Sequence, residues 1–282
     1  MNFRTDLAIE LKEAIPGESD GVLCEQLQIG NVEITRMIVD SQKGEQTLGR
    51  PQGRYVTIEA PPFVTDYEIN DDCRIAVQNE LQKMLGNCDG TVLVCGIGNV
   101  DITPDAFGPK VCAGVLSTRH IGDELSSLGK LRSVAVICPG VLGQTGIETG
   151  EIIRSVVDKI KPSAVIVVDA LAARSIKRLG NTVQLSDTGL IPGGGIGNKR
   201  EEISRHTLNV PVISVGVPTV VDACTLVRDF GGDCGVSNME NMVVTPKEID
   251  LLIDHAAKLT AHSINCALQT DLSAEDLLLL TN

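Results

Sequence analysis

Four short apolar runs constrain the fold of this chain most strongly. They are rich in β-branched residues and show no polar alternation; they span residues 92–95, 134–138, 164–168 and 210–215. Such runs are typical of strands that are covered on both faces, as in parallel sheets. Segments with helical periodicity lie between them, and the clearest spans 146–160, where Thr145 and Glu148 form a capping-box pattern. This alternation predicts an α/β fold of three layers, α/β/α, with a mostly parallel central sheet.

The flanking segments add smaller elements to this sheet. Residues 32–39 and 55–60 alternate between apolar and polar side chains and are joined by a polar loop, which predicts a small N-terminal β-hairpin extension. Helical spacing indicates a helix over 70–85, and a cap, proline and acid pattern at 245–248 predicts a helix to about 268, with a short helix after Ser273. Since no linker-like stretch divides the chain, we expect one domain over 1–282.

Composition limits the partners and the compartment. The 37 Asp and Glu against 24 Lys and Arg give a formal net charge of −13, which argues against a nucleic-acid-binding surface. No apolar run is long enough for a membrane span, and the first residues lack the apolar core of a secretion signal, so we expect a cytoplasmic protein.

The nine cysteines contain no Cys-x-x-Cys pair and predict neither a disulfide framework nor a zinc site. Cys95 and Cys138 lie in apolar runs and are expected to be core residues.

Two aspartates follow strand-like runs and are the first candidates for chemistry. Asp105 comes after a glycine turn, in a Thr-Pro-Asp pattern that is typical of a helix start, and Asp169 directly follows the run that ends at residue 168. If these strands are parallel neighbours, both carboxyls lie at the same edge of the sheet, where ligands bind in open α/β folds. Two carboxylates in one cleft can divide acid and base work. The residues alone also allow a structural interpretation, in which Asp105 caps a helix and Asp169 bonds the next turn.

Other motifs are weaker candidates for a functional site than Asp105 and Asp169. Asp187 and Asp222 also follow strand-like runs, and turn or cap roles are favoured for both. The glycine-rich loop 192–200 fails the P-loop pattern, and the Gly-x-Gly at 96–98 lacks the third glycine of a dinucleotide fingerprint. The four histidines form no paired metal-ligand motif, and no Gly-x-Ser-x-Gly elbow is present. We therefore expect no cofactor and no metal.

Ordered blocks along nearly the whole chain resemble the spore germination protease family. They are Arg-Thr-Asp-Leu-Ala-Ile-Glu (4–10), the block 98–109 with Thr-Pro-Asp-Ala-Phe-Gly-Pro, Pro-Gly-Val-Leu-Gly-Gln-Thr-Gly-Ile-Glu-Thr (139–149), Asp-Ala-Leu-Ala-Ala-Arg-Ser (169–175), and the blocks 186–189, 218–223 and 244–250. The resemblance implies an endopeptidase of the germinating spore core that degrades small acid-soluble spore proteins. It also implies an atypical aspartic peptidase whose catalytic residues are Asp105 and Asp169.

The same resemblance implies a homotetrameric zymogen that removes its own N-terminal segment. Its motif places the cleavage between Asp6 and Leu7, so that residues 1–6 form a short pro-segment. Gly96-Ile97-Gly98-Asn99, followed by Asp105 and Gly108, also resembles the opening of hydrogenase maturation endopeptidases, which implies a related fold. A metal-dependent endopeptidase of that type is therefore one alternative, and a catalytically inactive binder of spore proteins is another.

Overall fold

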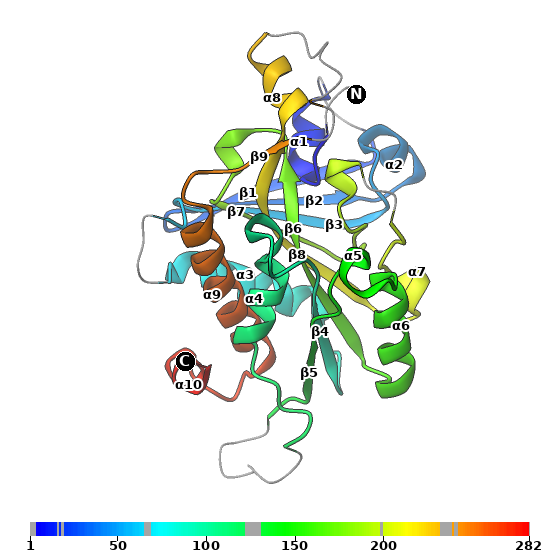
Figure 1. Ribbon diagram of the computed structural model, residues 1–282, viewed down its shortest axis with the longest axis vertical. Coiled ribbons are helices and arrows are strands. Elements are labelled where there is room, and N and C mark those ends of the chain that lie inside the picture. The colour runs from blue at the N-terminus through cyan, green and yellow to red at the C-terminus, as the bar shows by residue number, and fades with distance from the viewer. Residues whose placement is uncertain are drawn as a thin grey trace.

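One sheet organises the chain in the computed structural model (Figure 1), which describes residues 4–15, 17, 20–64, 69–121, 131–197, 200–231, 239 and 242–281. Its strand order is β1 (Val22–Ile29), β2 (Val32–Val39), β3 (Gly53–Glu59), β7 (Thr182–Ser186), β8 (Val212–Asp222), β6 (Ala164–Ala173), β4 (Val92–Gly96) and β5 (Val134–Ile137). The short strand β9 (Val243–Val244) pairs with β8.

The strands predicted from the four apolar runs form the parallel part of the sheet. β8, β6, β4 and β5 run parallel to one another. The predicted hairpin is present as the antiparallel pair β2 and β3, with the helix α2 (Gln42–Leu48) in its connection. Two strands that the sequence patterns did not predict, β1 and β7, pair antiparallel with β2 and β3 and join this wing to β8.

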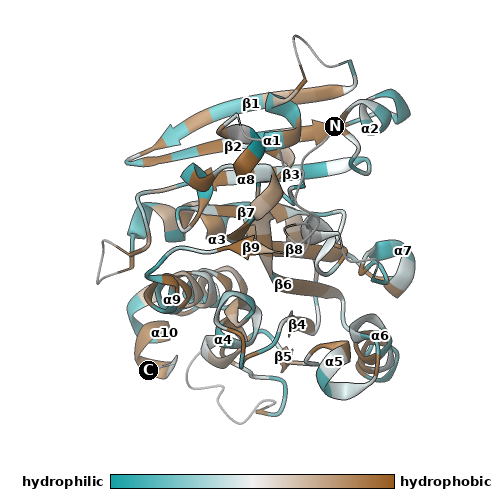
Figure 2. Cartoon of the chain, turned by 45° about the horizontal axis from the view of Figure 1, so that its top comes forward, coloured by the Kyte–Doolittle hydropathy of each residue, from teal (hydrophilic) through white to brown (hydrophobic). Residues whose placement is uncertain are grey.

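Helices cover both faces of the sheet and confirm the predicted three layers. On one face, α3 (Asp71–Leu85), α4 (Phe107–Gly114) and α9 (Ile249–Leu268) pack over a large apolar cluster. On the other face lie α6 (Thr149–Ile160) and α7 (Arg205–Leu208), with α1 (Ala8–Glu13) and α2 over the antiparallel wing. Figure 2 shows that β6 and β8 in the middle of the sheet are mostly hydrophobic, whereas β1, α2 and α6 carry hydrophilic stretches. Val94 and Cys95 face different clusters, as expected for a strand with two buried faces.

The remaining short elements complete the layers. They are α5 (Leu142–Thr145), α8 (Ala223–Asp229), α10 (Ala274–Thr281) and the 3₁₀ turns Thr103–Asp105, Ile176–Arg178 and Gly194–Ile196. The helix after Ser273 is thereby confirmed, and the Ser273 hydroxyl accepts from the Asp276 N–H. No helix within the described ranges has the length and apolar character needed to cross a membrane. The assignment of 1–282 to one domain stays a prediction.

Two predicted helix starts are wrong. The predicted helix over 146–160 begins only at Thr149, because Thr145 ends the separate helix α5 and Gly146 turns the chain in a left-handed conformation (φ 71°). The pattern at 245–248 is followed by α9 from Ile249, and the Thr245 hydroxyl instead donates to the Thr219 carbonyl (2.9 Å). In both places the threonine that the pattern assigns as the helix cap belongs to another interaction: Thr145 ends α5, and Thr245 donates to β8.

Two residues lie elsewhere than predicted. Asp169 lies in the middle of β6, which continues to Ala173, because β8 extends alongside it beyond the point where β4 ends. The prediction that Cys138 is a core residue is wrong: Cys138 is exposed, because β5 is the last strand of the sheet and ends at Ile137. Cys95 is buried as predicted.

Candidate active site

Asp105 is held by the turn that follows β4. Gly98 takes a backbone conformation with φ +126°, and a Cβ atom there would lie 1.9 Å from the Asp105 carbonyl oxygen, so the turn needs glycine. The Asp105 Oδ2 accepts a hydrogen bond from the Asn99 N–H at 2.7 Å. Asp105 thus closes the glycine turn and does not cap α4, which begins at Phe107 after a residue without side-chain capping.

Side chains from two other elements brace this turn. The pairing of β6 with β8 shifts register between Leu171 and Ala172, which leaves Thr219 as an extra residue of β8. The Thr219 hydroxyl donates to the Pro104 carbonyl at 2.8 Å. From α5, the Gln144 Nε2 donates to the Asn99 Oδ1 at 2.6 Å. Residues from β8 and α5 therefore fix the segment that carries Asp105.

Asp169 lies deeper than Asp105. It is 5% exposed, and its Oδ1 accepts from the Ala170 N–H at 2.9 Å. Its partner on β8 is Gly216, where an added Cβ would lie 2.5 Å from the Leu171 Cγ. β4 has ended at this level, since its last residue, Gly96, pairs with Val168. The Asp169 side chain therefore borders an open space beside the strand.

Asp105 and Asp169 line one cavity of about 360 Å³, together with residues of the 141–150 and 192–201 segments. Burial raises the pKa of the Asp169 carboxyl well above its usual range, and the charges of Asp105 and Asp6 raise it further, against the N–H groups of Ala170 and Gly193. Burial also raises the pKa of Asp105, and the Asn99 N–H opposes that change. The predicted pair is thus brought together in a site that favours retention of a proton.

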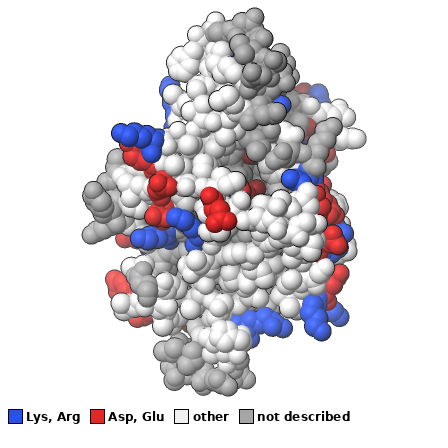
Figure 3. Space-filling model, in the orientation of Figure 1, with Lys and Arg blue, Asp and Glu red and all other residues white. Residues whose placement is uncertain are grey.

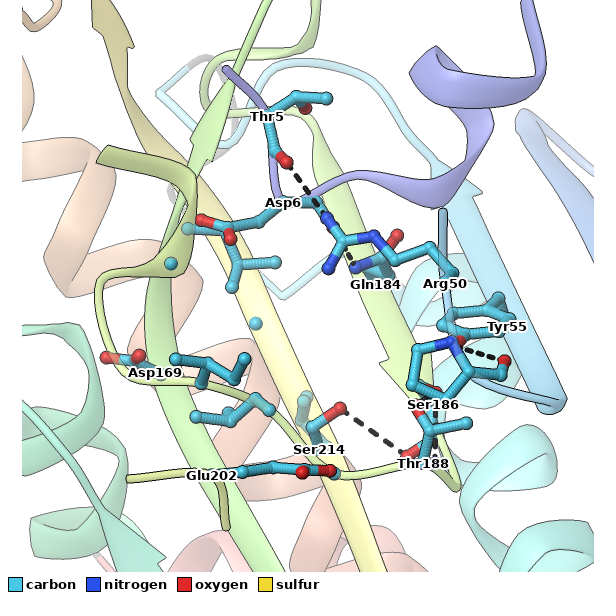
Figure 4. A pocket seen from close by; sticks show the side chains of 18 residues that line it. Thr5, Asp6, Arg50, Tyr55, Asp169, Gln184, Ser186, Thr188, Glu202 and Ser214 are labelled. Atoms are coloured by element: carbon cyan, nitrogen blue, oxygen red, sulfur yellow. Dashed lines mark hydrogen bonds between the residues drawn. The ribbon is translucent and has the colours of Figure 1, made fainter. Parts of the chain in front are cut away.

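A third carboxyl, that of Asp6, lies between this cavity and a second one of about 270 Å³, and Asp6 and Asp169 line both. The Asp6 N–H donates to the Ala172 carbonyl, and the Ala172 N–H donates to the Asp6 Oδ2, both at 2.8 Å. Burial raises the pKa of Asp6, while the Ala172 and Gly195 N–H groups and the charge of Arg50 lower it. Figure 4 shows Asp6 with Asp169 on one side and Gln184 and Arg50 on the other.

The peptide bond between Asp6 and Leu7 is held on both sides. The Gln184 Nε2 donates to the Asp6 carbonyl at 2.9 Å, and the Gln184 Oε1 accepts from the Ala8 N–H at 2.7 Å. The Leu7 side chain is fully buried. The Arg50 Nη2 donates to the Thr5 carbonyl at 2.9 Å. Of the predicted pro-segment, residues 4–6 are described, and they lie along the end of β6.

Glu10 anchors the chain just after this bond. Its carboxylate accepts from the backbone N–H groups of Arg174 (2.7 Å) and Ser175 (2.9 Å) and from the Thr5 hydroxyl. The Arg178 guanidinium lies 3.6 Å from the same carboxylate. Charge-assisted hydrogen bonds of this kind are stronger than neutral ones. The contacts with Arg174, Ser175 and Arg178 therefore hold α1 at the end of β6, and Thr5 adds a further contact from the predicted pro-segment.

Sequence reasoning missed Arg50, Gln184 and Glu10, whose roles depend on contacts between distant segments. The structural roles favoured for Asp187 and Asp222 are confirmed. Asp187 accepts from the Arg54 backbone N–H and side chain, both at 2.7 Å, and Asp222 caps α8. In the part of the chain that the structure describes, no group of three or more His, Cys, Asp or Glu side chains is arranged to hold a metal ion.

Comparison with known proteins agrees with the resemblance seen in the sequence. The model of the germination protease family matches residues 5–231. The germination protease of Clostridium perfringens (strain ATCC 13124) is 38% identical over 98% of both chains, and that of Bacillus subtilis (strain 168) is 34% identical over 97% of this chain and 95% of its own.

Among solved structures, a NiFe hydrogenase maturation protease from Thermococcus kodakarensis KOD1 aligns with 67% of this chain and 98% of its own, at a TM-score of 0.41 and 19% identity. The family assignment rests on the sequence matches, which extend over almost the entire chain. The chain therefore belongs to the germination protease family and is a peptidase of spore germination.

Proposed function

We propose that this protein is an atypical aspartic endopeptidase in which Asp105 and Asp169 activate water against a peptide bond. One observation carries the proposal: the two carboxyls line a single cavity, and burial together with neighbouring charge raises the pKa of Asp169. Carboxyls whose environments separate their proton affinities can act as an acid and base pair. Asp169, the more buried of the two, is the protonated partner, and Asp105 is the ionised one.

The reaction then transfers two protons: one is removed from the attacking water, and one is delivered to the leaving nitrogen. The Asp105 carboxylate takes a proton from water as the water oxygen attacks the peptide carbonyl carbon. Asp169 gives its proton to the amide nitrogen as the carbon–nitrogen bond breaks, so that the amine leaves neutral. General acid and base catalysis of this kind contributes about 10²–10⁴-fold for each group.

Asparagine variants test the two carboxyls directly. Asp105→Asn and Asp169→Asn should each lower cleavage of a purified small acid-soluble spore protein by roughly 10²-fold or more. Asp158→Asn, at an exposed position of α6, is the matched control and should keep full activity. Urea unfolding of all three variants establishes that they are folded. Near-normal cleavage by either site variant would contradict the mechanism.

We propose small acid-soluble spore proteins as the substrate, on the basis of the family resemblance. The chain's net charge of −13 supports a protein substrate over a nucleic acid. On the face in Figure 3, the described Lys and Arg side chains lie scattered, several of them beside acidic side chains. Incubation with the purified substrate separates the alternatives: an inactive binder leaves it intact, and a metal-dependent endopeptidase loses its activity with a chelator.

We also propose that the chain cleaves itself between Asp6 and Leu7. Asp6 lines the same cavity as Asp105 and Asp169, and we infer that an intact segment restricts the entry of a substrate. Glu10 and the buried Leu7 would keep α1 in place after residues 1–6 leave. Mass analysis of the N-terminus during activation should reveal a new terminus at Leu7. Full activity in a chain that still carries residues 1–6 would refute this proposal.

We also propose that the protein is a homotetramer. We propose further that it is located in the forespore and later in the spore core. Exposed apolar side chains on α10, such as Leu279 at 79% exposure, support association between subunits. Sedimentation equilibrium of the purified protein should give four times the chain mass of 29.9 kDa. A fluorescent fusion should appear in the forespore compartment. A monomeric mass at micromolar concentration would contradict the tetramer and leave the proposed chemistry unaffected.

A further inference from the structure

Two cysteines from different elements meet beside the candidate site. Cys112 lies on α4 and is 5% exposed, whereas Cys138 directly follows β5 and is exposed. Their contacts are reciprocal. The Cys112 Sγ lies 3.6 Å from the Ile137 carbonyl oxygen, and the Cys138 Sγ lies 4.0 Å from the Pro109 carbonyl oxygen. Each sulfur therefore contacts the segment that carries the other cysteine.

The interaction between the two thiols shifts their pKa values in opposite directions. It stabilises the anion of Cys138 and lowers the pKa of that thiol to about 7, although burial acts in the opposite direction. It raises the pKa of Cys112, as burial does. Near pH 7, a larger fraction of Cys138 is then thiolate than for a cysteine with an ordinary pKa of about 8.5. The pair thus combines an accessible nucleophile with a buried, protonated neighbour.

We propose that Cys138 and Cys112 form a peroxide-reactive thiol pair that closes to a reversible disulfide. The Cys138 thiolate attacks one oxygen of a hydroperoxide, the oxygen–oxygen bond breaks, and water or an alcohol leaves after taking up a proton. The sulfur of Cys112 then attacks the resulting sulfenic acid, and a second water leaves with the Cys112 proton. The peroxide is reduced, and the two thiols are oxidised to one disulfide.

Other cysteines in the described part of the chain lack this combination. Cys24 is exposed, but partial burial raises the pKa of its thiol. Cys95 lies close to the pair, but it is fully buried, and burial together with the charge of Cys138 raises the pKa of its thiol. Oxidation should therefore be selective for Cys138, with Cys24 as the internal reference for an exposed thiol.

The proposed disulfide would connect two walls of the candidate site. Cys112 lies on the helix that directly follows Asp105, and this helix packs closely on β4, because a Cβ on Gly96 would lie 2.2 Å from the Gly108 carbonyl oxygen. Cys138 comes shortly before Val141 and Leu142, which line the cavity of Asp105 and Asp169. A covalent link there would restrict the motion of these walls relative to each other. The proposal itself does not depend on the mechanism of peptide cleavage.

Peptide mapping of the intact protein after brief exposure to hydrogen peroxide at pH 7 tests the proposal. Besides the disulfide that Cys224 already forms, we expect one new linked peptide pair containing Cys112 and Cys138, about 2 Da lighter than the sum of the two peptides and separated again by dithiothreitol. Without peroxide, iodoacetamide should modify Cys138 severalfold faster than Cys24, since the pKa of Cys138 is lowered and that of Cys24 is raised. Two free thiols after oxidation, or sulfinic acid on Cys138 without a link, would overturn the pairing.

Two variants separate the steps. In Cys112→Ser, the sulfenic acid of Cys138 has no resolving thiol and should be trapped by dimedone. In Cys138→Ser, no dimedone adduct should form on the buried Cys112. Cys24→Ser should form the same linked pair as the original chain. Equal dimedone labelling of Cys112 in the Cys138→Ser variant would contradict the assigned order of attack.

Discussion

Replacing Asp169 with asparagine should stabilise the fold at neutral pH while removing a carboxyl from the candidate site. Burial and the charges of Asp105 and Asp6 raise the pKa of Asp169, whereas an aspartate in the unfolded chain has a pKa of about 3.9. Between these two pKa values the folded state binds more protons than the unfolded state, so the free energy of unfolding falls as the pH rises. Each tenfold difference in proton affinity costs the fold about 1.4 kcal/mol above this range.

Asparagine is neutral and does not carry this cost. Its Oδ1 can keep the bond from the Ala170 N–H, but its NH₂ group cannot accept from the Gly193 N–H, which favours the carboxylate form of Asp169. Loss of that second bond costs about 1 kcal/mol. The net change is stabilising once the proton affinity of Asp169 has risen more than about tenfold, and the pKa lies well above its usual range.

Urea unfolding at pH 4, 5.5 and 7 measures this effect. The difference in unfolding free energy between Asp169→Asn and the original chain should grow in favour of the variant as the pH rises from about 4. Asp158→Asn, on the exposed face of α6, should show no such trend. A difference that is constant over this pH range would refute the assignment of a raised pKa to Asp169.

Three substitutions test how the N-terminal segment and α4 are seated. In Gly195→Ala, the new Cβ would lie 2.2 Å from the Asp6 Oδ2. Release of residues 1–6 should therefore slow at least tenfold in a mass-spectrometric time course. Gly194→Ala is the control and should release the segment at the normal rate, since its new Cβ would have its nearest neighbour at 3.5 Å. Glu10→Gln should lower the free energy of unfolding in urea by about 2 kcal/mol, because an amide cannot accept from both backbone N–H groups at the end of β6. Gly108→Ala should lower the melting temperature by several degrees, since its Cβ would lie 2.2 Å from the Ile97 carbonyl oxygen; an unchanged melting temperature would contradict the close packing of α4.

The central strands could be predicted because burial on both faces leaves a continuous apolar run. The sequence patterns do not predict β7, because three of its buried residues, Thr182, Gln184 and Ser186, are polar and interrupt the apolar run. Gln184 is tolerated there because it bonds to Asp6 and Ala8, which come from the other end of the chain. β1 escaped for the opposite reason: it is an edge strand with mostly exposed side chains and no clear alternation, held by backbone pairing with β2.

In the candidate site, too, local patterns predict some residues, whereas contacts between distant segments are not predicted. Asp105 and Asp169 could be located because each follows an apolar run that the sequence marks clearly. The seating of Asp6 against Ala172 joins residues 166 positions apart, and no local pattern encodes such a contact. The exposure of Cys138 likewise depends on β5 being the last strand in the sheet, which the order of strands along the chain does not determine.

The bulge at Thr219 makes the placement of Asp105 depend on how many residues β8 contains. The extra residue supplies the hydroxyl that holds the Pro104 carbonyl, while it interrupts the pairing of β8 with β6. A strand one residue shorter could pair more regularly, but it would offer no anchor at this point. A β8 without the extra residue would give the more regular sheet, whereas a β8 with it gives the segment of Asp105 its anchor. No point substitution converts one into the other, so this part of the site can be lost or gained only through a deletion or an insertion.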